Sequence, residues 1–356
     1  MRRGLALTLT VAMLGSLLAG CGSSGGGSAP KADATAAAAP AGGGTEEVTT
    51  PDKVLKFTDQ NAEDSPAGMW EQKFADLVKE YTKGHIEVEL YFNNTLCGYD
   101  IQPLQAGICD FIQYVPSSAG DLDSRLGAFD APYIYRDADH RLAVFDPFNS
   151  EPLKVINEAL KDDGVMLLSS FNSGYRQITC NFPIRNLSDM KGAKIRVVPS
   201  DLYQQLFTAF GAAATPMAFS EVPTALITNV IDGQENPYSV IVSSALYEVQ
   251  KYCMETNHLP TNHGLWMNRN TYESLTPEQQ EAVLKAAYDA SAYMDKYILD
   301  KVEEYKKICE DNGMEIIDAE NGLDIDGFKA AAENVYDYFA EDWGDMPDLI
   351  LSLIHI

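Results

Sequence analysis

The spacing of apolar positions changes along the chain, and these changes predict where strands and helices lie. Between 85 and 92 every second residue is apolar, which predicts a strand with one buried face. Residues 54–58 predict another strand. Ser65 and Pro66 then offer an N-cap and a first-turn proline to a helix with one apolar face. With a short helix at about 100–106 and a strand near Phe111, these segments predict a strand–helix–strand unit.

The alternation continues in the second half of the chain. The apolar patterns there predict strands at 165–169 and 194–198. They predict helices at 202–210 and 221–228. The longest helix signal begins with a capping box, Thr276 with Gln279, and continues to about residue 312. A helix of that length measures about 50 Å, so it must cross more than one compact lobe.

Alternating strands and helices are typical of the α/β class. Residues 53–350 are numerous enough for two lobes with separate cores, and no fixed-period repeat occurs in them. We therefore predict a two-lobed α/β fold in which the long helix spans both lobes. The expected division places 53–173 and 263–300 in lobe I, and 174–262 and 301–350 in lobe II.

The N-terminal residues resemble an export signal rather than a part of the fold. Basic residues precede an apolar stretch at 5–18, and Leu18-Ala19-Gly20-Cys21 fits a bacterial lipobox. We predict a signal peptide at 1–20, a lipidated Cys21, and a flexible Gly/Ser/Ala/Pro tether over 21–52. The protein would then be extracytoplasmic and anchored to the membrane by lipid. An uncleaved membrane anchor is the alternative.

The charge balance limits the classes of partner. The chain has 52 acidic and 26 basic residues, a formal charge of −26. Nucleic acids and anionic membrane surfaces need a positive surface, so neither is expected as a partner. An anionic ligand would be repelled by the overall field, and its site must therefore concentrate positive charge locally.

The cysteine and histidine pattern predicts neither a disulfide framework nor a metal site. Five cysteines remain after Cys21, an odd number at wide spacing, and these favour buried thiols. A single pair, Cys97 with Cys109, stays open. There is no CxxC, and His258 and His263 are five residues apart, so a structural zinc site is not expected. We expect no cofactor and no metal; a bound cation is left open.

Three polar residues in the middle of the chain are the leading candidates for a binding site. Arg176 lies in GYRQIT, Arg196 in KGAKIRV and Asn236 in DGQENP. A guanidinium presents paired donors to both oxygens of a carboxylate, which lysine cannot do equally well. The alternatives are a strand-end surface charge for Arg196, an interlobe ion pair for Arg176 and a turn-forming amide for Asn236.

Other candidates lie where strands end, because ligands of open α/β sheets collect beyond the carboxyl ends of strands. Asn61 follows the first strand, and Tyr114 follows the strand at Phe111. Asn172, Tyr238 and Trp266 are further candidates for lining a cleft, with membership of the core as the alternative. No residue is predicted to be catalytic.

Several long stretches resemble the extracytoplasmic solute-binding proteins of tripartite ATP-independent periplasmic (TRAP) transporters, the DctP family. The matching stretches are SGYRQIT (173–179), NLSDMKGAKIRV (186–197), GAAATPMAFSEVPTALITNVIDGQENP (211–237) and YEVQKYCMETNH (247–258). The resemblance implies a periplasmic-binding-protein-like fold with the ligand between the lobes. It also implies that Arg196 binds the ligand carboxylate, with Arg176 and Asn236 as further contacts.

By the same resemblance, the partners are a carboxylated solute and the small and large integral membrane subunits of a transporter driven by an ion gradient. We expect a monomer that closes around a four-carbon dicarboxylate or a sugar acid. The segment FIQYVPSS (111–118) has no acidic residue, whereas some members of the family carry one there that contacts polar ligand groups. Two alternatives stay open: a sensor lipoprotein that feeds a signalling receptor, and a secreted hydrolase.

Overall fold

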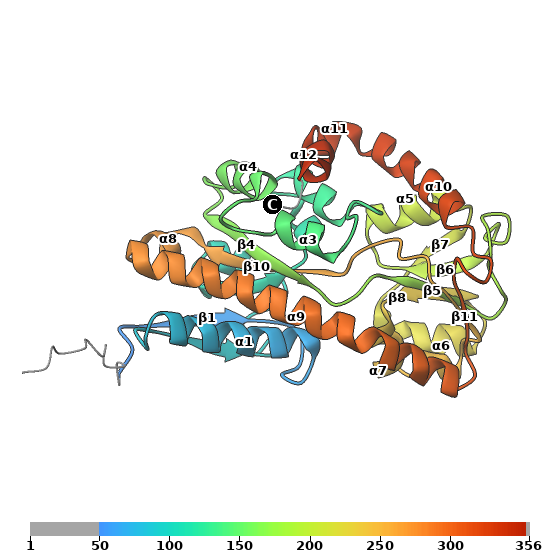
Figure 1. The fold of residues 1–356 in the computed structure, drawn as a ribbon, viewed down its shortest axis with the longest axis horizontal. Coiled ribbons are helices and arrows are strands. Elements are labelled where there is room, and N and C mark those ends of the chain that lie inside the picture. The colour runs from blue at the N-terminus through green and yellow to red at the C-terminus, as the bar shows by residue number, and fades with distance from the viewer. Residues whose placement is uncertain (1–49, 354–356) are drawn as a thin grey trace, which may run out of the picture. The chain divides into compact units, whose positions relative to one another are not determined.

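The computed structural model describes residues 50–353, so the predicted signal peptide, Cys21 and most of the tether lie outside the described residues. One five-stranded sheet forms the first lobe, in the order β2-β1-β3-β10-β4 (Figure 1). Its strands are β1 (Lys53–Thr58), β2 (Ile86–Tyr91), β3 (Phe111–Tyr114), β4 (Val165–Asn172) and β10 (Asn262–Asn268). β1 runs parallel to β2 and β3, whereas β10 runs antiparallel to β3 and β4.

A six-stranded sheet forms the second lobe, in the order β11-β9-β5-β8-β6-β7. Its strands are β5 (Gln177–Cys180), β6 (Lys194–Val197), β7 (Ala213–Pro216), β8 (Gly233–Asn236), β9 (Tyr252–Met254) and β11 (Glu315–Ile317). β8 lies between β5, to which it is antiparallel, and β6, to which it is parallel. This order brings three segments that are distant in sequence to one part of the sheet.

Helices cover the sheets and connect their strands. They are α1 (Pro66–Tyr81), α2 (Gln102–Gln105), α3 (Ala138–Val144), α4 (Glu151–Ala159), α5 (Asp201–Ala209), α6 (Val222–Ile227), α7 (Tyr238–Ser243), α8 (Arg269–Glu273), α9 (Pro277–Asp311), α10 (Ile325–Tyr338), α11 (Ala340–Trp343) and α12 (Met346–Ser352). Short 3-10 helices are η1 (Pro116–Ala119), η2 (Ser124–Asp130), η3 (Phe219–Glu221) and η4 (Leu246–Glu248). The predicted strands and helices all occur, although the helix near 100–106 has only four residues.

Two chain segments connect the lobes and pair with each other. One joins β4 to β5 and the other joins β9 to β10. The backbone N–H of Ser173 donates to the carbonyl of Thr261 at 3.1 Å, and that of Arg176 donates to the carbonyl of Leu259 at 2.9 Å. Two lobes joined by paired crossing segments confirm the predicted two-lobed α/β fold.

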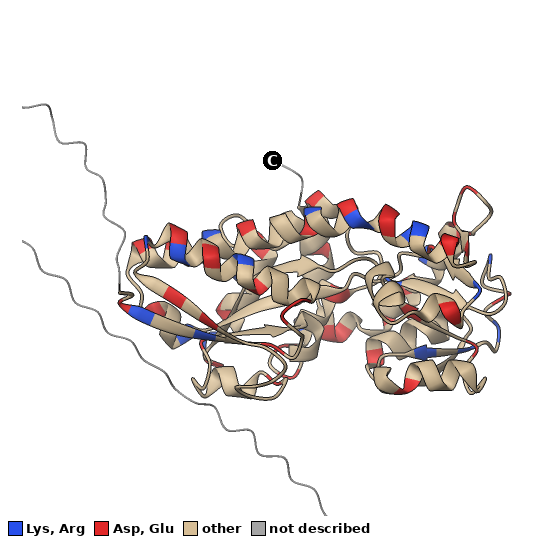
Figure 2. Cartoon of the chain, turned by 90° about the horizontal axis from the view of Figure 1, so that it is seen from below, with Lys and Arg blue, Asp and Glu red and all other residues tan. Residues whose placement is uncertain are grey.

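α9 is the long helix that the capping box predicted, and it contacts both lobes. Thr276 and Gln279 form the reciprocal capping bonds at its start. The helix packs on α1 and β4 of the first lobe, and on α7 and β11 of the second. Alanines at 282, 286, 287 and 290 form much of its buried face, which allows α1 to approach closely. Acidic and basic residues alternate along its outer face (Figure 2), where Lys285–Asp289 and Lys296–Asp300 form ion pairs one turn apart.

The C-terminal helices return to the first lobe, which corrects the predicted domain boundary. α10 packs on α5 of the second lobe, but α11 packs on η2, and α12 packs on both η2 and α4. Gly127 lies under Trp343 so closely that a Cβ at residue 127 would be 2.5 Å from the indole nitrogen. Residues 340–352 therefore belong with lobe I rather than lobe II. The sequence pattern gave helices here but no information on which lobe they contact.

Candidate functional site

Three predicted site residues, Arg176, Arg196 and Asn236, lie on or next to neighbouring inner strands of the second sheet. Asn236 is the last residue of β8, and it pairs in register with Gln177, the residue after Arg176. Arg196 lies on β6 opposite Gln234 of the same central strand. Because β5 begins where β8 and β6 end, all three side chains lie near the segments that lead to the first lobe.

Arg176 is paired inside the protein. Its guanidinium forms an ion pair with the carboxylate of Glu235, to which Nε and Nη2 both donate. Nη2 also donates to the Glu235 carbonyl at 2.9 Å and to the amide oxygen of Asn236 at 3.0 Å. Both charged side chains are buried. The prediction left open an interlobe ion pair for Arg176; an ion pair exists, but both partners belong to the second lobe.

Glu235 has a second partner in His258. The imidazole Nε2 lies 3.3 Å from the Glu235 carboxylate, and its Nδ1 lies 2.8 Å from the hydroxyl of Thr256. Burial acts to raise the pKa of Glu235, but the charge of Arg176 and the hydrogen bonds from His258 and Arg176 together outweigh it, and the pKa lies below its ordinary value. Burial lowers the pKa of His258. Glu235 is therefore held as a carboxylate that neutralises Arg176.

Arg196 has no such partner among residues 50–353. Its Nε and Nη2 donate to the carbonyl of Met217 at 3.0 and 2.8 Å, and its guanidinium lies over the ring of Phe219 at 5.6 Å. It forms no ion pair with any described residue. Burial, with a smaller contribution from the positive charge of Arg176, lowers the pKa of Arg196, although Glu235 and Tyr203 act in the opposite direction. A guanidinium remains charged at neutral pH even so, which leaves a buried cation in need of an anion.

Asn236 lies in a chain of side-chain hydrogen bonds within the sheet. Its amide nitrogen donates to Gln234, whose own amide nitrogen donates to Thr179 at 2.9 Å. Thr179 in turn donates to Gln250 at 3.0 Å. With its oxygen bound to Arg176 as well, Asn236 fixes the position of that arginine in this structure.

The first lobe contributes Asn61 and Tyr114. The amide of Asn61 donates to both carboxylate oxygens of Asp59, each at 3.0 Å. Asn61 also lines a cavity of about 550 Å³ between the start of α1 and α7. Tyr114 is half-buried at the end of β3, and its ring contacts that of Tyr99 with 4.7 Å between centroids. Both residues lie at strand ends, as predicted.

Asp59 has a buried acidic neighbour, Glu71 on α1. No part of Glu71 is exposed, and neither of its carboxyl oxygens has a hydrogen-bond partner among residues 50–353. Burial, followed by the proximity of Asp59, raises the pKa of Glu71 well above its ordinary value. Burial and the nearby Asp59 carboxylate therefore favour the neutral form of Glu71. No sequence pattern indicates that these two acids lie together, because Glu71 occurs in an ordinary amphipathic helix.

The remaining predicted contacts have structural partners. The side-chain oxygen of Asn172 accepts from the backbone N–H groups of Gly174 and Thr261, at 3.1 and 2.9 Å, and so ties the two connecting segments together. The hydroxyl of Tyr238 donates to Glu255 at 2.8 Å. Trp266 is fully buried, and its indole donates to the carbonyl of Tyr114 at 2.8 Å. We correct the prediction for Trp266, since a ring with no exposed surface cannot contact a solute.

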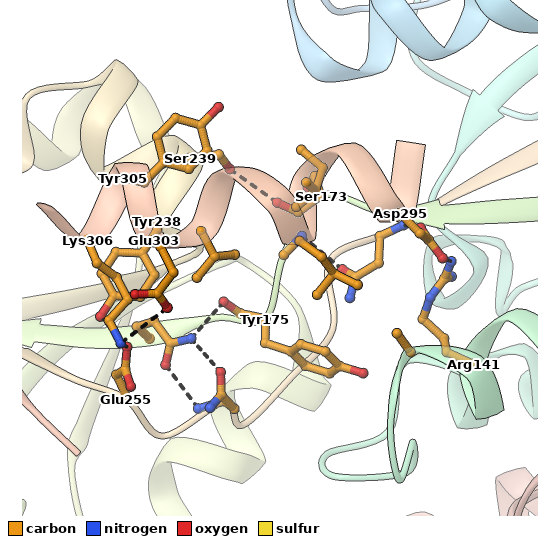
Figure 3. A pocket seen from close by; sticks show the side chains of 18 residues that line it. Arg141, Ser173, Tyr175, Tyr238, Ser239, Glu255, Asp295, Glu303, Tyr305 and Lys306 are labelled. Atoms are coloured by element: carbon orange, nitrogen blue, oxygen red, sulfur yellow. Dashed lines mark hydrogen bonds and ion pairs between the residues drawn. The ribbon is translucent and has the colours of Figure 1, made fainter. Parts of the chain in front are cut away.

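A cavity of about 240 Å³ lies where the connecting segments pass α9 (Figure 3). Tyr175 extends into this region, between the ion pair of Lys306 with Glu255 and the buried pair of Arg141 with Asp295. The Asp295 carboxylate also accepts from the backbone N–H of Asn172 at 2.8 Å. The cavity includes neither Arg176 nor Arg196. It belongs to the connection between the lobes, and Asp295 fixes α9 to that connection.

Sequence reasoning missed Glu235, His258, Arg141 and Asp295. For Asp295 a signal existed, because it falls on the apolar stripe of the long helix between Ser291 and Ile298. Charged residues on a buried face are expected to be paired. For Glu235 the signal was weaker, since one acid in a four-residue strand does not reveal which face it lies on.

The comparisons with known proteins decide the family. The family model described as bacterial extracellular solute-binding protein, family 7 (DctP), matches residues 57–342. The chain belongs to this family. Its members and structural neighbours are solute-binding proteins rather than enzymes, which confirms the expectation that the chain is not an enzyme. Among residues 50–353, no helix is long and apolar enough to cross a bilayer.

The DctP relatives align over most of their length. The 2,3-diketo-L-gulonate-binding periplasmic protein of Escherichia coli is 29% identical over 84% of this chain and 90% of its own. A C4-dicarboxylate-binding protein of Bacillus subtilis is 30% identical, over 71% and 74% of the two chains. A TRAP periplasmic solute-binding protein from Roseobacter denitrificans, solved with L-galactonate, superposes with a TM-score of 0.69 at 29% identity, over 85% and 99%. These matches confirm the two-lobed fold.

Proposed function

We propose that this protein is the receptor of a TRAP transporter and that it captures an organic acid, a four-carbon dicarboxylate or a sugar acid, by binding its carboxylate at Arg196. One observation carries this proposal: of the two arginines at the site, Arg176 is neutralised by Glu235, whereas Arg196 has no acidic partner among the described residues. A buried guanidinium with unused donors is matched in charge and geometry by a carboxylate.

The other residues of the site have distinct proposed roles. Arg176 and Asn236 form a hydrogen-bonded polar surface against which the ligand binds. Arg176 also adds positive charge to this surface, although it is paired with Glu235. Asn61 and Tyr114 complete the contacts from the first lobe when the lobes close. Asn172 and Tyr238 act at the connection, where their hydrogen bonds fix the segments that must bend. Binding energy then shifts an open form toward a closed one.

The choice of ligand class follows the relatives. Those described above are named for 2,3-diketo-L-gulonate and for C4-dicarboxylates, and the solved relative holds L-galactonate. Each of these ligands has a carboxylate. The absence of an acidic residue from 111–118 makes the choice between dicarboxylate and sugar acid an experimental question.

The cellular setting is also part of the proposal. The lipobox at Cys21 supports a mature protein that is anchored by lipid outside the cytoplasm, with residues 22–52 as a tether. We propose that it acts as a monomer and delivers its ligand to small and large integral membrane subunits. No cofactor is required for this function.

A thermal-shift screen of residues 46–356, which form one compact unit, tests the proposal. The compounds are C4-dicarboxylates, uronates, aldonates, keto acids and neutral sugars. Ligand at 100 times its dissociation constant should add about 2.7 kcal/mol of stability. We expect acids to stabilise the protein, and Arg196→Ala to remove that shift. Arg185→Ala, which replaces a partly exposed arginine of the same lobe, should retain it. Stabilisation by neutral sugars alone, or acid binding that survives Arg196→Ala, would overturn the proposed site.

A further inference from the structure

The two sheets turn the carboxyl ends of their parallel strands toward each other. In the first lobe β4 leads out toward the second lobe, and β1, β2 and β3 run in the same direction as β4. In the second lobe β5 enters from the first lobe, and β8, β6 and β7 run in the opposite direction to β5. A solute between the lobes is therefore surrounded by the segments that follow these strands.

The segments at the facing edges contain acidic residues but no lysine or arginine. In the first lobe they are 59–65 after β1, 92–101 after β2 and 115–123 after β3. Their acidic residues are Asp59, Glu63, Asp64, Asp100, Asp121 and Asp123. Arg125, just beyond the third segment, is paired with Asp123. In the second lobe 198–200 and 217–221 follow β6 and β7, and they contain no basic residue either.

Basic residues near the connecting segments are paired with acids. The ion pairs are Arg141–Asp295, Arg176–Glu235 and Lys306–Glu255. Arg196, on β6, forms no ion pair with a described residue. Within residues 50–353, these strands and connections thus offer one unpaired guanidinium, whose charge is matched by one carboxylate rather than by two.

The cavity of about 550 Å³ between the start of α1 and α7 lies at these edges, because α1 follows β1 and α7 follows β8. Its lining contains no lysine or arginine, and its acidic member is Asp64. The neutral polar lining includes Asn61, Ser173, Ser239, Thr261, His263 and Tyr305. The hydroxyl of Ser239 donates to the carbonyl of Ser173 at 3.2 Å, which links α7 to the connection (Figure 3).

His263 adds hydrogen-bonding groups to this cavity without adding charge. Its ring stacks on Phe171 with 4.5 Å between centroids, and Nε2 lies 2.9 Å from the hydroxyl of Ser173. Its Nδ1 and the hydroxyl of Thr261 are buried without a hydrogen-bond partner among residues 50–353. Burial lowers the pKa of His263 to about 4, so the ring is neutral at neutral pH. A neutral imidazole has one donor and one acceptor, which suits a hydroxyl group.

Asn61 also suits a hydroxyl group better than a carboxylate. Its amide nitrogen donates to both carboxylate oxygens of Asp59, each at 3.0 Å. The oxygen of the same amide is left to a solute, and it only accepts hydrogen bonds. A hydroxyl can donate to this oxygen. An ionised carboxylate cannot, and it would also be repelled by Asp59.

We propose that the solute is a sugar acid with one carboxylate, which binds Arg196, and that its hydroxyl groups bind in the cavity beside Asn61 and His263. This inference rests on the proposed function and narrows its ligand class. A C4-dicarboxylate is disfavoured, because its second carboxylate would lose hydration on lobe closure and would meet acidic segments without a cation. Hydroxyl groups carry no charge, and they both donate and accept.

Calorimetric titration of the purified full-length chain with paired ligands tests the class. D-gluconate is paired with D-glucarate, and D-galactonate with galactarate, so that each pair differs only in a terminal hydroxymethyl or carboxylate group. D-glucuronate and D-galacturonate are further sugar acids, and succinate and L-malate represent C4-dicarboxylates. We expect at least one sugar acid to bind about tenfold or more tightly than every dicarboxylate in the set, equivalent to about 1.4 kcal/mol.

Two variants test the cavity. His263→Phe keeps a ring on Phe171 but removes both nitrogens, and Asn61→Leu removes the amide from a loop position. We expect each variant to weaken the sugar acid by about tenfold. His85→Phe, at an exposed histidine, should leave the affinity unchanged. Melting of the ligand-free variants checks folding, and Asn61→Leu decides the question if His263→Phe fails to fold.

The outcomes separate this inference from the proposed function. If a dicarboxylate binds as tightly as the best sugar acid and Arg196→Ala abolishes its binding, the proposed function stands and the sugar-acid assignment is wrong. If no acid in the set binds, the proposed function is wrong and the inference fails with it. Unchanged affinity in folded His263→Phe and Asn61→Leu would show that the hydroxyl groups do not bind in this cavity.

Discussion

The guanidinium of Arg176 is bound to the carboxylate of Glu235, and both side chains are buried within the second lobe. Arg196, on a strand of the same sheet, has only the carbonyl of Met217 and the ring of Phe219 as partners among the described residues. Two arginines that look equivalent in sequence therefore differ in their surroundings. One is neutralised by an acidic neighbour, and the other forms no ion pair with a described residue.

Replacement of Arg196 by lysine should test the shape of the group separately from its charge. Arg196→Lys keeps a positive charge but loses the planar pair of donors. We expect the affinity for the stabilising acid to fall by about 10- to 100-fold, equivalent to the loss of one charge-assisted hydrogen bond. Isothermal titration calorimetry measures this, with Arg185→Lys as control. An unchanged dissociation constant would mean that the carboxylate binds elsewhere.

Loss of the Glu235 charge should destabilise the protein, whereas loss of Arg196 should not. Glu235→Gln leaves Arg176 buried without a counter-charge, which costs about 3–5 kcal/mol in comparable cases. We expect a lower melting temperature by calorimetry, and partial recovery in Glu235→Gln with Arg176→Met. Asp300→Asn, which removes an exposed ion pair with Lys296, should cost less than about 1 kcal/mol. If Glu235→Gln and Asp300→Asn behave alike, the buried pair has no special role.

The buried acid Glu71 should make stability depend on pH. Its folded pKa is raised, so as pH rises above its ordinary value of 4.5 the unfolded chain releases a proton that the folded protein keeps. Stability contributed by this group is full at lower pH and is lost as pH rises toward the folded pKa, by at most about 1.4 kcal/mol per pH unit.

Glu71→Gln has no carboxyl group to ionise, so it should remove this loss of stability at rising pH. We expect the melting temperature of the variant, relative to wild type, to increase between about pH 4 and about pH 8. Glu80→Gln, at an exposed position of the same helix, should show no such trend. A constant difference across the pH range would show that Glu71 is ionised in the folded protein.

Gly233 should tolerate no side chain. A Cβ there would lie 2.2 Å from the carbonyl oxygen of Thr179 on β5 and 3.1 Å from the side chain of Ile195 on β6. We expect Gly233→Ala to cost about 1–3 kcal/mol by overpacking and to weaken acid binding, because it would displace β6, which carries Arg196, and β5, which Arg176 precedes. In Gly98→Ala the new methyl group meets open space, so denaturant titration should show little change. Equal stability of the two variants would contradict the close approach of β5 and β8.

Much of the local structure followed from the sequence. The alternating residues at 86–91, the proline after Ser65 and the capping box at Thr276 each fix a dihedral preference or a hydrogen bond within a few residues, so strands and helices could be placed from them. The resemblance identified the family, and the apolar neighbours of Arg196 indicated the burial that the structure shows, whereas its contact with a ligand stays a prediction. Trp266 was misplaced, because an aromatic residue in a strand has the same local pattern whether it faces a cleft or a core.

The sequence by itself thus determined the elements, the two-lobed α/β class and the candidate arginines, since these depend on local periodicity and on residue type. Only the tertiary structure decided that Glu235 neutralises Arg176, that Glu71 lies against Asp59, and that the C-terminal helices return to the first lobe. Each of these relationships joins elements whose order in the sheet or whose packing face is set by long-range contacts. Burial and charge pairing at such contacts, rather than any local pattern, decide which polar groups are free to bind a ligand.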